Sequence, residues 1–415
     1  MSFIIAAPSS GSGKTTITLG LLRAISHRTT VRAAKSGPDY IDPRFHEAAC
    51  GQPCVNLDAW AMRPDRIKAL AAGTAPLIVE GAMGLFDGAP PDGKGSTADL
   101  AQILGMPVVL GVDAAKMAGS VAPLVQGVAQ FHPQVHVAGV ILNNVGSPKH
   151  ERMLRAALKG VTIFGVVPRT ATLTQPSRHL GLVQAQEHAD LETYLTTAAN
   201  LIDTSVDMDA LLSLDAPALD AGASKRLQPP AQRIAIAHDT AFAFTYPHIL
   251  NDWRSNGAEI SFFSPLADEA PPPADFIYLP GGYPELHAGR IASNTRFLDS
   301  LRTTEATIYG ECGGYMVLGD ALTDAQGKAH QMAGLLSLET SFATRKLHLG
   351  YRHLAATTGP FVGQWAGHEF HYATTVRARG APLFAATDAE GSQLPPMGLI
   401  QNNVAGSFAH IIDAC

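Results

Sequence analysis

The stretch that decides the fold stands at the start of the chain, where residues 3–16 read FIIAAPSSGSGKTT. A short apolar run, a loop rich in Gly and Ser, and the apolar segment ITLGLLRAI follow in the order of a strand, a phosphate-binding loop and a helix. In such a P-loop, glycines let backbone N–H groups curl around a phosphate, Lys14 meets its charge, and the Thr15 hydroxyl can hold Mg²⁺. The predicted ATP-binding residues are Gly11, Ser12, Gly13, Lys14, Thr15 and Thr16.

The rest of the chain continues the same alternation. Short runs rich in β-branched residues stand at 3–7, 31–35, 75–80, 107–112, 137–143 and 162–167, and again at 233–237, 259–263, 276–279 and 307–309. Helix-like stretches separate them, which predicts buried parallel strands joined by crossover helices. We therefore expect an α/β protein with two domains, residues 1–202 and 232–415, and a linker over residues 203–231.

Composition limits the class of protein. The 415 residues are 46% apolar and 16% charged with a net charge of −6, which excludes a disordered chain and argues against a general nucleic-acid binder. We expect no membrane span, since no apolar run approaches about 18 residues, and no signal peptide, since the start lacks a basic region. The four cysteines make no disulfide framework. These features predict a cytoplasmic enzyme, for which a homodimer is an open alternative to a monomer.

Acidic residues follow the predicted strands of the first domain. Asp39 and Asp42 follow the second run, and Glu80 and Asp87 lie at the end of the third and shortly after it. In an open α/β sheet the loops after the strands converge on the ligand crevice. We expect Asp39 and Asp42 to act in phosphoryl transfer, and Glu80 and Asp87 to bind Mg²⁺ together with Thr15. Helix capping or turn formation is the alternative role for each acid.

A second chemical signal lies in the other half of the chain. Residues 310–314 read GECGG after a predicted strand, which is the pattern of a nucleophile elbow carrying Cys312. His410 is the candidate base, since a Cys and its His are commonly far apart in sequence. Glycines beside the elbow could offer backbone N–H donors to an oxyanion or to glutamine: Gly281, Gly282 and Gly313. A buried structural thiol is the alternative for Cys312.

A basic and aromatic region precedes the candidate base. Its residues suit a substrate with several carboxylates, which Arg binds through two hydrogen bonds; those that we expect to contact substrate are Arg345, Lys346, Arg352, His368 and His371. A zinc site at residues 368–371 is an alternative, although His-Glu-x-His is not the usual helical spacing. A solvated strand face is another.

Together, an ATP site and a Cys/His site indicate amidation driven by glutamine. The chain resembles the a,c-diamide synthases of the cobalamin pathway nearly end to end, through stretches that include GSGKTT, KSGPDYIDPRFH, VEGAMGLFDG, RIAIAHDTAFAFTY, YLPGGYPEL, GECGGYMVLG and GHEFHY. The resemblance implies an N-terminal P-loop domain similar to dethiobiotin synthetase and a C-terminal class I glutamine amidotransferase domain. It implies amidation of the a and c acetates of cobyrinic or hydrogenobyrinic acid through a phosphorylated carboxylate, with ATP, Mg²⁺ and glutamine.

Two positions depart from the expected motifs. A strict P-loop has Gly where this chain has Pro8. Class I enzymes usually read His-x-Glu, whereas Ile411 and Ile412 follow His410, so the orienting acid is missing from its usual place. We therefore expect a Cys–His dyad.

Other functions compete with this interpretation. Cobyric acid synthase is the nearest, but KSGPDYIDP and the moderate length favour the a,c-diamide enzyme. A related enzyme acting on another tetrapyrrole, such as nickel sirohydrochlorin, is a second. A partition-type P-loop ATPase, whose C-terminal domain only binds a partner, is a third, and the Cys312 elbow argues against it.

Overall fold

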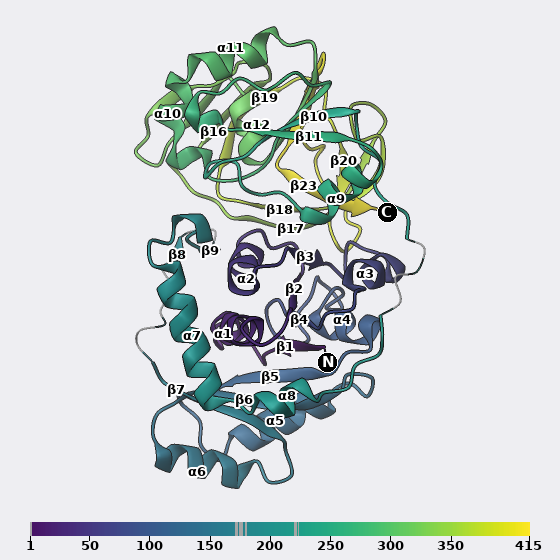
Figure 1. The fold of residues 1–415 in the computed structure, drawn as a ribbon. Helices are drawn as coiled ribbons and strands as arrows, with labels where there is room; N and C mark the ends of the chain where they lie inside the picture. The colour runs from purple at the N-terminus through teal and green to yellow at the C-terminus, as the bar shows by residue number, and fades with distance from the viewer. Residues whose placement is uncertain (1, 171–172, 174–176, 179–180, 220–221, 223) are drawn as a thin grey trace. The chain divides into compact units, whose positions relative to one another are not determined.

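The computed structural model describes residues 2–170, 173, 177–178, 181–219, 222 and 224–415. It divides into two compact units, Met1–Ser224 and Lys225–Cys415. Each unit is built around its own parallel sheet (Figure 1).

The sheet of the first unit has seven parallel strands in the order β3-β2-β4-β1-β5-β6-β7. The strands are β1 (Phe3–Ala6), β2 (Arg32–Ser36), β3 (Cys54–Leu57), β4 (Leu77–Glu80), β5 (Val108–Asp113), β6 (Val137–Val145) and β7 (Ile163–Pro168). Crossover helices join them: α1 (Lys14–Ser26), α2 (Asp42–Cys50), α3 (Pro64–Ala71), α4 (Thr97–Leu104), α5 (Val121–Gln130) and α6 (Pro148–Ala157). All residues of β1 and β4 are buried, which explains why all of them except Glu80 are apolar.

The six runs predicted in this unit correspond to β1, β2 and β4–β7, and β3 was missed. Its sequence CVNL is short and contains a polar residue. Asn56 uses its side-chain amide to donate to the carbonyls of Gly37 (2.9 Å) and Asp39 (2.7 Å), so the polar residue of β3 positions the loop that follows β2.

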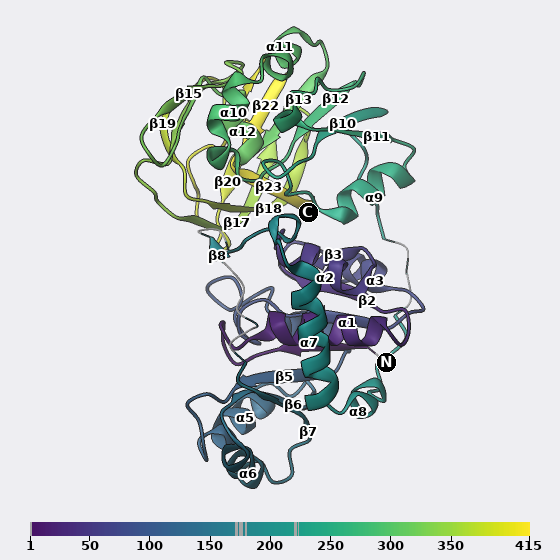
Figure 2. The same ribbon diagram turned by 60° about the vertical axis from the view of Figure 1, so that its left-hand side comes forward.

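The segment predicted as a linker, residues 203–231, is partly helical. Helix α7 (Leu191–Ser205) continues to Ser205 and packs along α1, and α8 (Met208–Leu212) follows it (Figure 2). The Asp207 amide donates to the Phe164 carbonyl at 2.7 Å, which ties the start of this segment to β7. Between the end of α8 at Leu212 and the start of β10 at Arg233, the described residues form no helix or strand. The division between the two units falls within this segment, after Ser224.

The second unit is built around a six-stranded sheet in the order β11-β10-β12-β13-β22-β21, parallel except for β21. Its strands are β10 (Arg233–Ala237), β11 (Glu259–Phe263), β12 (Phe276–Leu279), β13 (Thr307–Glu311), β21 (Leu399–Gln401) and β22 (Val404–Ser407). The first three match the predicted runs residue for residue. The helices are α9 (Pro247–Ser255), α10 (Ala288–Ser293), α11 (Thr295–Thr303) and α12 (Gly313–Leu318).

Two further four-stranded sheets in this unit were not predicted. One has the order β15-β14-β16-β19, with β14 (Ala321–Thr323), β15 (Ala329–Gln331), β16 (Ser337–Ser341) and β19 (Thr374–Arg379). The other is antiparallel, β20-β17-β18-β23, with β17 (His348–Ala356), β18 (Gly363–His371), β20 (Ala385–Thr387) and β23 (Ala409–Ala414). Several of these strands carry His, Arg and Gly, and some have only three residues, so they lack a clear apolar run.

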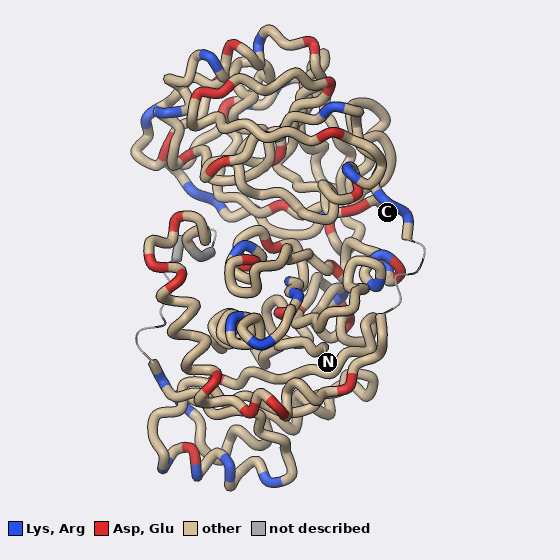
Figure 3. The backbone as a smooth tube through the Cα atoms, in the orientation of Figure 1, with Lys and Arg blue, Asp and Glu red and all other residues tan. Residues whose placement is uncertain are grey.

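Charged residues of both signs are interspersed along the backbone of each unit (Figure 3). Among the described residues, no helix combines the length and the hydropathy that crossing a membrane would require.

Candidate active sites

The P-loop is shaped by two glycines. Gly11 and Gly13 have φ angles of 78° and 82°, in the left-handed region that favours glycine. A Cβ on Gly13 would lie 2.2 Å from Nδ2 of Asn143, so this position also has no room for a side chain. Asn143, on β6, donates to the Ser12 carbonyl at 3.0 Å and holds the loop from the neighbouring strand. Sequence analysis did not single out Asn143, because a lone Asn in a strand carries no motif.

Glu80, the last residue of β4, is the centre of a buried network beside the P-loop. Its Oε1 accepts hydrogen bonds from Thr15 Oγ1 and Lys35 Nζ, both at 2.8 Å, and its Oε2 lies 2.7 Å from His46 Nε2. Burial alone would raise the pKa of Glu80, but the Lys35 charge and the His46 hydrogen bond outweigh it and lower the pKa. The Glu80 carboxylate is therefore ionised. Its Oε1 and the Thr15 hydroxyl oxygen lie 2.8 Å apart, and both are potential ligands of a metal ion.

Lys35 connects Glu80 to the predicted acids of the next loop. Its Nζ lies 2.6 Å from Asp42 and 3.9 Å from Asp39. Although burial would lower the pKa of Lys35, these carboxylates raise it well above its usual value. Burial and the Asp39 charge raise the pKa of Asp42 to about 6, against the opposing effect of Lys35. The structure thus brings Asp39, Asp42 and Glu80 together around a lysine that sequence analysis had not selected.

Lys14 and Asp87 both make hydrogen bonds to the backbone of the loop that follows β4. Lys14 Nζ donates to the carbonyl of Met83, a residue with a φ of 48°. Burial lowers the pKa of Lys14, and the charges of Glu80 and Asp87 act against this. Asp87 Oδ2 accepts from the Gly84 amide at 2.8 Å, so it also forms a turn. Thr15 and Glu80 fit Mg²⁺, which prefers oxygen ligands; Asp87 is less directly placed.

The second unit carries Cys312 on a strained turn between β13 and α12. Its φ of 46° and ψ of −98° are unusual for a residue with a side chain, and such strain is typical of a nucleophile elbow. A Cβ on Gly314 would lie 1.9 Å from the Leu279 carbonyl oxygen, so the turn requires glycine there. Burial, and then the Glu285 charge, raise the pKa of the Cys312 thiol far above its usual value. The resting thiol is protonated and needs a base.

His410 is placed to be that base. A Cβ on Gly281 would lie 2.3 Å from His410 Cε1, 3.1 Å from Nε2 and 3.4 Å from the Cys312 Cβ, so the thiol and the imidazole meet at this glycine. A Cβ on Gly313 would lie 3.1 Å from the Gly282 nitrogen, and the Gly313 amide hydrogen-bonds to the Cys312 sulfur. The three predicted glycines therefore surround the nucleophile.

The structure corrects the expectation that His410 has no acid beside it. Glu311 Oε2 lies 3.4 Å from His410 Nδ1. The same oxygen accepts from the Tyr278 hydroxyl at 2.6 Å, and Oε1 accepts from the Ile411 amide at 3.0 Å. Sequence analysis looked for the acid downstream of His410, whereas it lies almost a hundred residues upstream, directly before Cys312.

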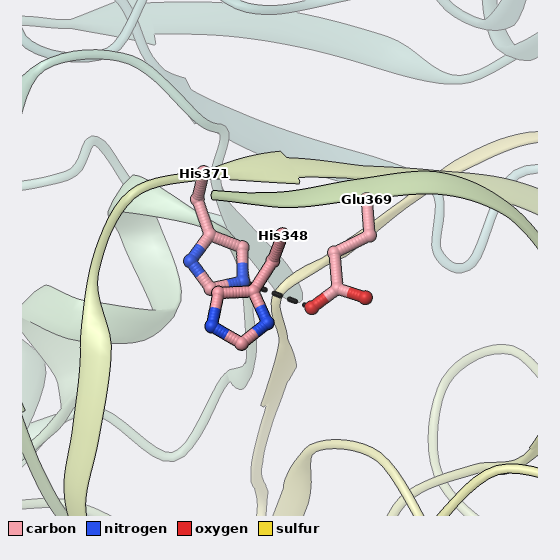
Figure 4. A group of neighbouring side chains, drawn as sticks. All are labelled: His348, Glu369 and His371. Carbon is pink, nitrogen blue, oxygen red and sulfur yellow. Dashed lines mark hydrogen bonds and ion pairs between the residues drawn. The ribbon is translucent and has the colours of Figure 1, made fainter. Parts of the chain in front are cut away.

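The basic region forms an ion-pair network on β17 and β18 (Figure 4). Glu369 is hydrogen-bonded by Arg352 at 2.7 and 3.0 Å, and its other oxygen lies 2.9 Å from His371 Nε2. Although burial opposes it, His371 and Arg352 lower the pKa of Glu369 to about 2. The ring of His348 stacks on that of His371 at 4.6 Å and 6°.

This network argues against the predicted zinc alternative. Donor atoms of His348, Glu369 and His371 lie within 4.8 Å of one another. However, the imidazoles of His348 and His371 stack with nearly parallel planes, so they do not aim their nitrogens at a common point. Burial and the His410 charge lower the pKa of His368 to about 3, so it is neutral. Arg345 and Lys346 lie exposed in the loop before β17.

Comparisons with known proteins match a part of each unit to a protein family. Residues 3–183 match the family described as the CobQ/CobB/MinD/ParA nucleotide binding domain, and residues 233–414 match the CobB/CobQ-like glutamine amidotransferase domain. A structure titled "Crystal structure of glutamine amidotransferase" matches 33% of this chain and 70% of its own, with 16% identity and a TM-score of 0.24. The two matched domains define a glutamine-dependent amidotransferase joined to a nucleotide-binding domain.

Curated relatives match the whole length. A hydrogenobyrinate a,c-diamide synthase of Brucella anthropi is 55% identical over 100% of this chain and 98% of its own. Those of Brucella abortus and Rhizobium meliloti are 56% and 52% identical over 99% of this chain and 98% of theirs. The chain belongs to the hydrogenobyrinate a,c-diamide synthase family, so the resemblance predicted from the sequence is confirmed.

Proposed function

We propose that this enzyme amidates the a and c acetate carboxylates of hydrogenobyrinic acid, using ATP and ammonia released from glutamine. The choice of substrate rests on the identity of 55% and 56%, over nearly the full length, to relatives named for hydrogenobyrinate. Hydrogenobyrinic acid is the cobalt-free corrin. Because the relatives are named for it, we favour it over cobyrinic acid as the substrate. The same relatives favour the a,c-diamide reaction over that of cobyric acid synthase and over a nickel sirohydrochlorin substrate.

The first unit would activate the carboxylate. A substrate carboxylate oxygen bonds to the γ-phosphorus of ATP as the bond to ADP breaks, which yields an acyl phosphate. Lys14 and Lys35 supply positive charge to the transferring group, and Glu80 and Asp42 hold Lys35 in place. Mg²⁺ held by Thr15 and Glu80, with Asp87 nearby, would neutralise phosphate charge. Asp39 would support Lys35 from a longer distance.

The second unit would release ammonia. Cys312 transfers its thiol proton to His410 Nε2, and the sulfur attacks the carboxamide carbon of glutamine. Backbone amides at Gly282 and Gly313, which lie close together, would donate to the oxyanion. His410 returns the proton to the leaving nitrogen, and water then hydrolyses the thioester to glutamate. The ammonia displaces phosphate from the acyl phosphate and forms the amide.

Other parts of the proposal rest on residue chemistry alone. Arg345 and Lys346, which are exposed, suit the peripheral carboxylates of a corrin. Arg352 and His371 are engaged with Glu369 and would act by shaping the site. His368, neutral and buried, would act likewise. A cytoplasmic location and a homodimer stay predictions.

The test is amidation followed by mass spectrometry. The enzyme is incubated with ATP and glutamine labelled with nitrogen-15 in its amide, and with hydrogenobyrinic or cobyrinic acid in parallel. We expect two labelled nitrogens in hydrogenobyrinic acid, none without ATP, and slower incorporation into cobyrinic acid. Glutamine hydrolysis without incorporation into either corrin would overturn the proposed substrate. Four further amidations of a diamide would indicate the cobyric acid synthase reaction instead.

A further inference from the structure

The carboxylate that precedes the nucleophile in the chain has no assigned part in the reaction. Glu311 is the last residue of β13, and Cys312 follows it at the elbow. The parallel pairing of β13 with β22 brings Glu311 opposite Ser407, three residues before His410. One short strand end therefore carries the nucleophile and an acid, and both face the segment that supplies the base.

Glu311 holds His410 through two different atoms. Its Oε2 lies 3.4 Å from the ring nitrogen Nδ1, and its Oε1 accepts from the amide of the next residue, Ile411. The acid thus lies within ion-pair distance of the Nδ1 side of the ring, while Nε2 lies on the side of Gly281 and the thiol. A base with an acid beside one ring nitrogen and the nucleophile beside the other has the arrangement that general-base catalysis requires.

The surroundings of Glu311 are built to keep its carboxylate in place. The residue is 3% exposed, and the Tyr278 hydroxyl donates to its Oε2 at 2.6 Å. Tyr309 packs beside Tyr278, with ring centroids 6.0 Å apart. Among the described residues, other ionisable groups of this region include the Cys312 thiol, Glu285, the neutral imidazole of His368 and the Arg352–Glu369 pair. Within the described residues, Glu311 is an acid that lies within ion-pair distance of the His410 ring.

We propose that Glu311 is the positioning residue that completes a Cys312–His410–Glu311 triad, with its acid taken from the residue before the nucleophile. It orients the imidazole and gives the imidazolium a countercharge when His410 accepts the thiol proton. The proton stays on His410 and does not pass to Glu311. This inference rests on the glutaminase reaction and not on the identity of the corrin.

The test is a set of substitutions read in a glutaminase assay that needs no corrin, so a wrong corrin would not affect it. Glu311→Gln keeps the size and removes the charge, and we expect kcat for glutamine hydrolysis to fall about 100-fold with little change in KM. The acidic limb of the pH profile should move to lower pH by about 1 unit, because the protonated imidazole loses its countercharge. A purely structural role would not move that limb.

Two controls separate orientation from packing. Tyr278→Phe removes a hydrogen bond to the same oxygen but keeps the charge, so kcat should stay within about 3-fold and the limb should not move. Glu311→Asp keeps the charge and should recover part of kcat with the wild-type limb. The thermal midpoint is measured for each variant.

Three results would overturn the proposal. One is a Glu311→Gln enzyme with near wild-type kcat and an unchanged pH profile. Another is a loss of kcat that only parallels a loss of folded protein. If Glu311→Gln does not fold, Glu311→Asp decides: a lower kcat at unchanged KM and thermal midpoint supports the triad, and a wild-type kcat overturns it.

Discussion

The two units hold their reactive groups in opposite electrostatic states. Beside the P-loop, Glu80 is ionised and its charge is matched by Lys35, so the site is assembled from charges before any ligand binds. At the elbow, Cys312 is buried and protonated, and charge arises there only when His410 takes the proton. Phosphoryl transfer needs charges fixed in advance. A thiol that attacks only with its substrate in place benefits from staying neutral until then.

The largest effect that separates the two sites is expected from Cys312→Ala. Without the sulfur, amidation driven by glutamine should fall at least about 1,000-fold, because no thioester can form. Amidation with added ammonium should continue, since the first unit is untouched. Nitrogen-15 incorporation from either source measures both, and Cys415→Ala, at an exposed cysteine, is the matched control. Loss of the ammonium reaction as well would contradict the two-site scheme.

The reverse pattern is expected from Glu80→Gln. Removing this charge deprives Thr15 and Lys35 of their common partner, so amidation from either nitrogen source should fall about 100- to 1,000-fold. Glutamine hydrolysis without ATP should persist. Asp92→Asn, at an exposed position of the same unit, is the control. Equal loss of both activities in Glu80→Gln would mean that this carboxylate supports more than the ATP site.

A steric test of the elbow comes from Gly281→Ala. The new Cβ would lie 2.3 Å from His410 Cε1, so the imidazole must move and glutamine hydrolysis should fall about 100-fold. Gly289→Ala, whose Cβ would meet its nearest atom at 3.4 Å, is the control. Both variants should keep amidation from ammonium. An active Gly281→Ala enzyme would show that His410 is not needed where the structure places it.

The smallest effect concerns the charge of the resting thiol. Because burial raises the pKa of Cys312, its alkylation by iodoacetamide should still be increasing at pH values where that of exposed Cys415 has levelled off. The pH at half-maximal rate is compared, rather than the rate, since burial also limits access. Peptide mass spectrometry distinguishes the two cysteines. A lower midpoint for Cys312 than for Cys415 would reveal a thiolate already formed in the free enzyme.

The sequence predicted the framework of both sites because strands and loops leave local signals. Runs such as 3–7 and 276–279 are apolar and end in Gly or Pro, so the first strands and the elbow could be placed. Strands β17 and β18 could not be predicted in this way, because polar residues such as His353 and Glu369 interrupt any apolar pattern. These strands are partly buried and also carry residues of a candidate site, and only the folded structure reveals both roles.

Residues that act through long-range contacts escaped prediction for a related reason. Lys35 and His46 both reach Glu80 from other elements of the first unit, and neither lies in a motif that names a partner. Glu311 was visible in GECGG, but its relation to His410 depends on the pairing of β13 with β22. Sequence spacing predicts such a pair only when both members share one local segment.

The pairing of β13 with β22 makes the active site sensitive to the register of these two strands. The Cys312 amide donates to the Ser407 carbonyl at 2.8 Å, and Glu311 stands opposite Ser407 in the sheet. Because alternate residues of a strand face opposite sides, a slip of one residue along this seam would turn Glu311 away from His410 and move Cys312 out of its turn. An inserted or deleted residue in β13 or β22 should thus abolish ammonia release even in a chain that still folds, which makes the seam a natural place for an engineered switch.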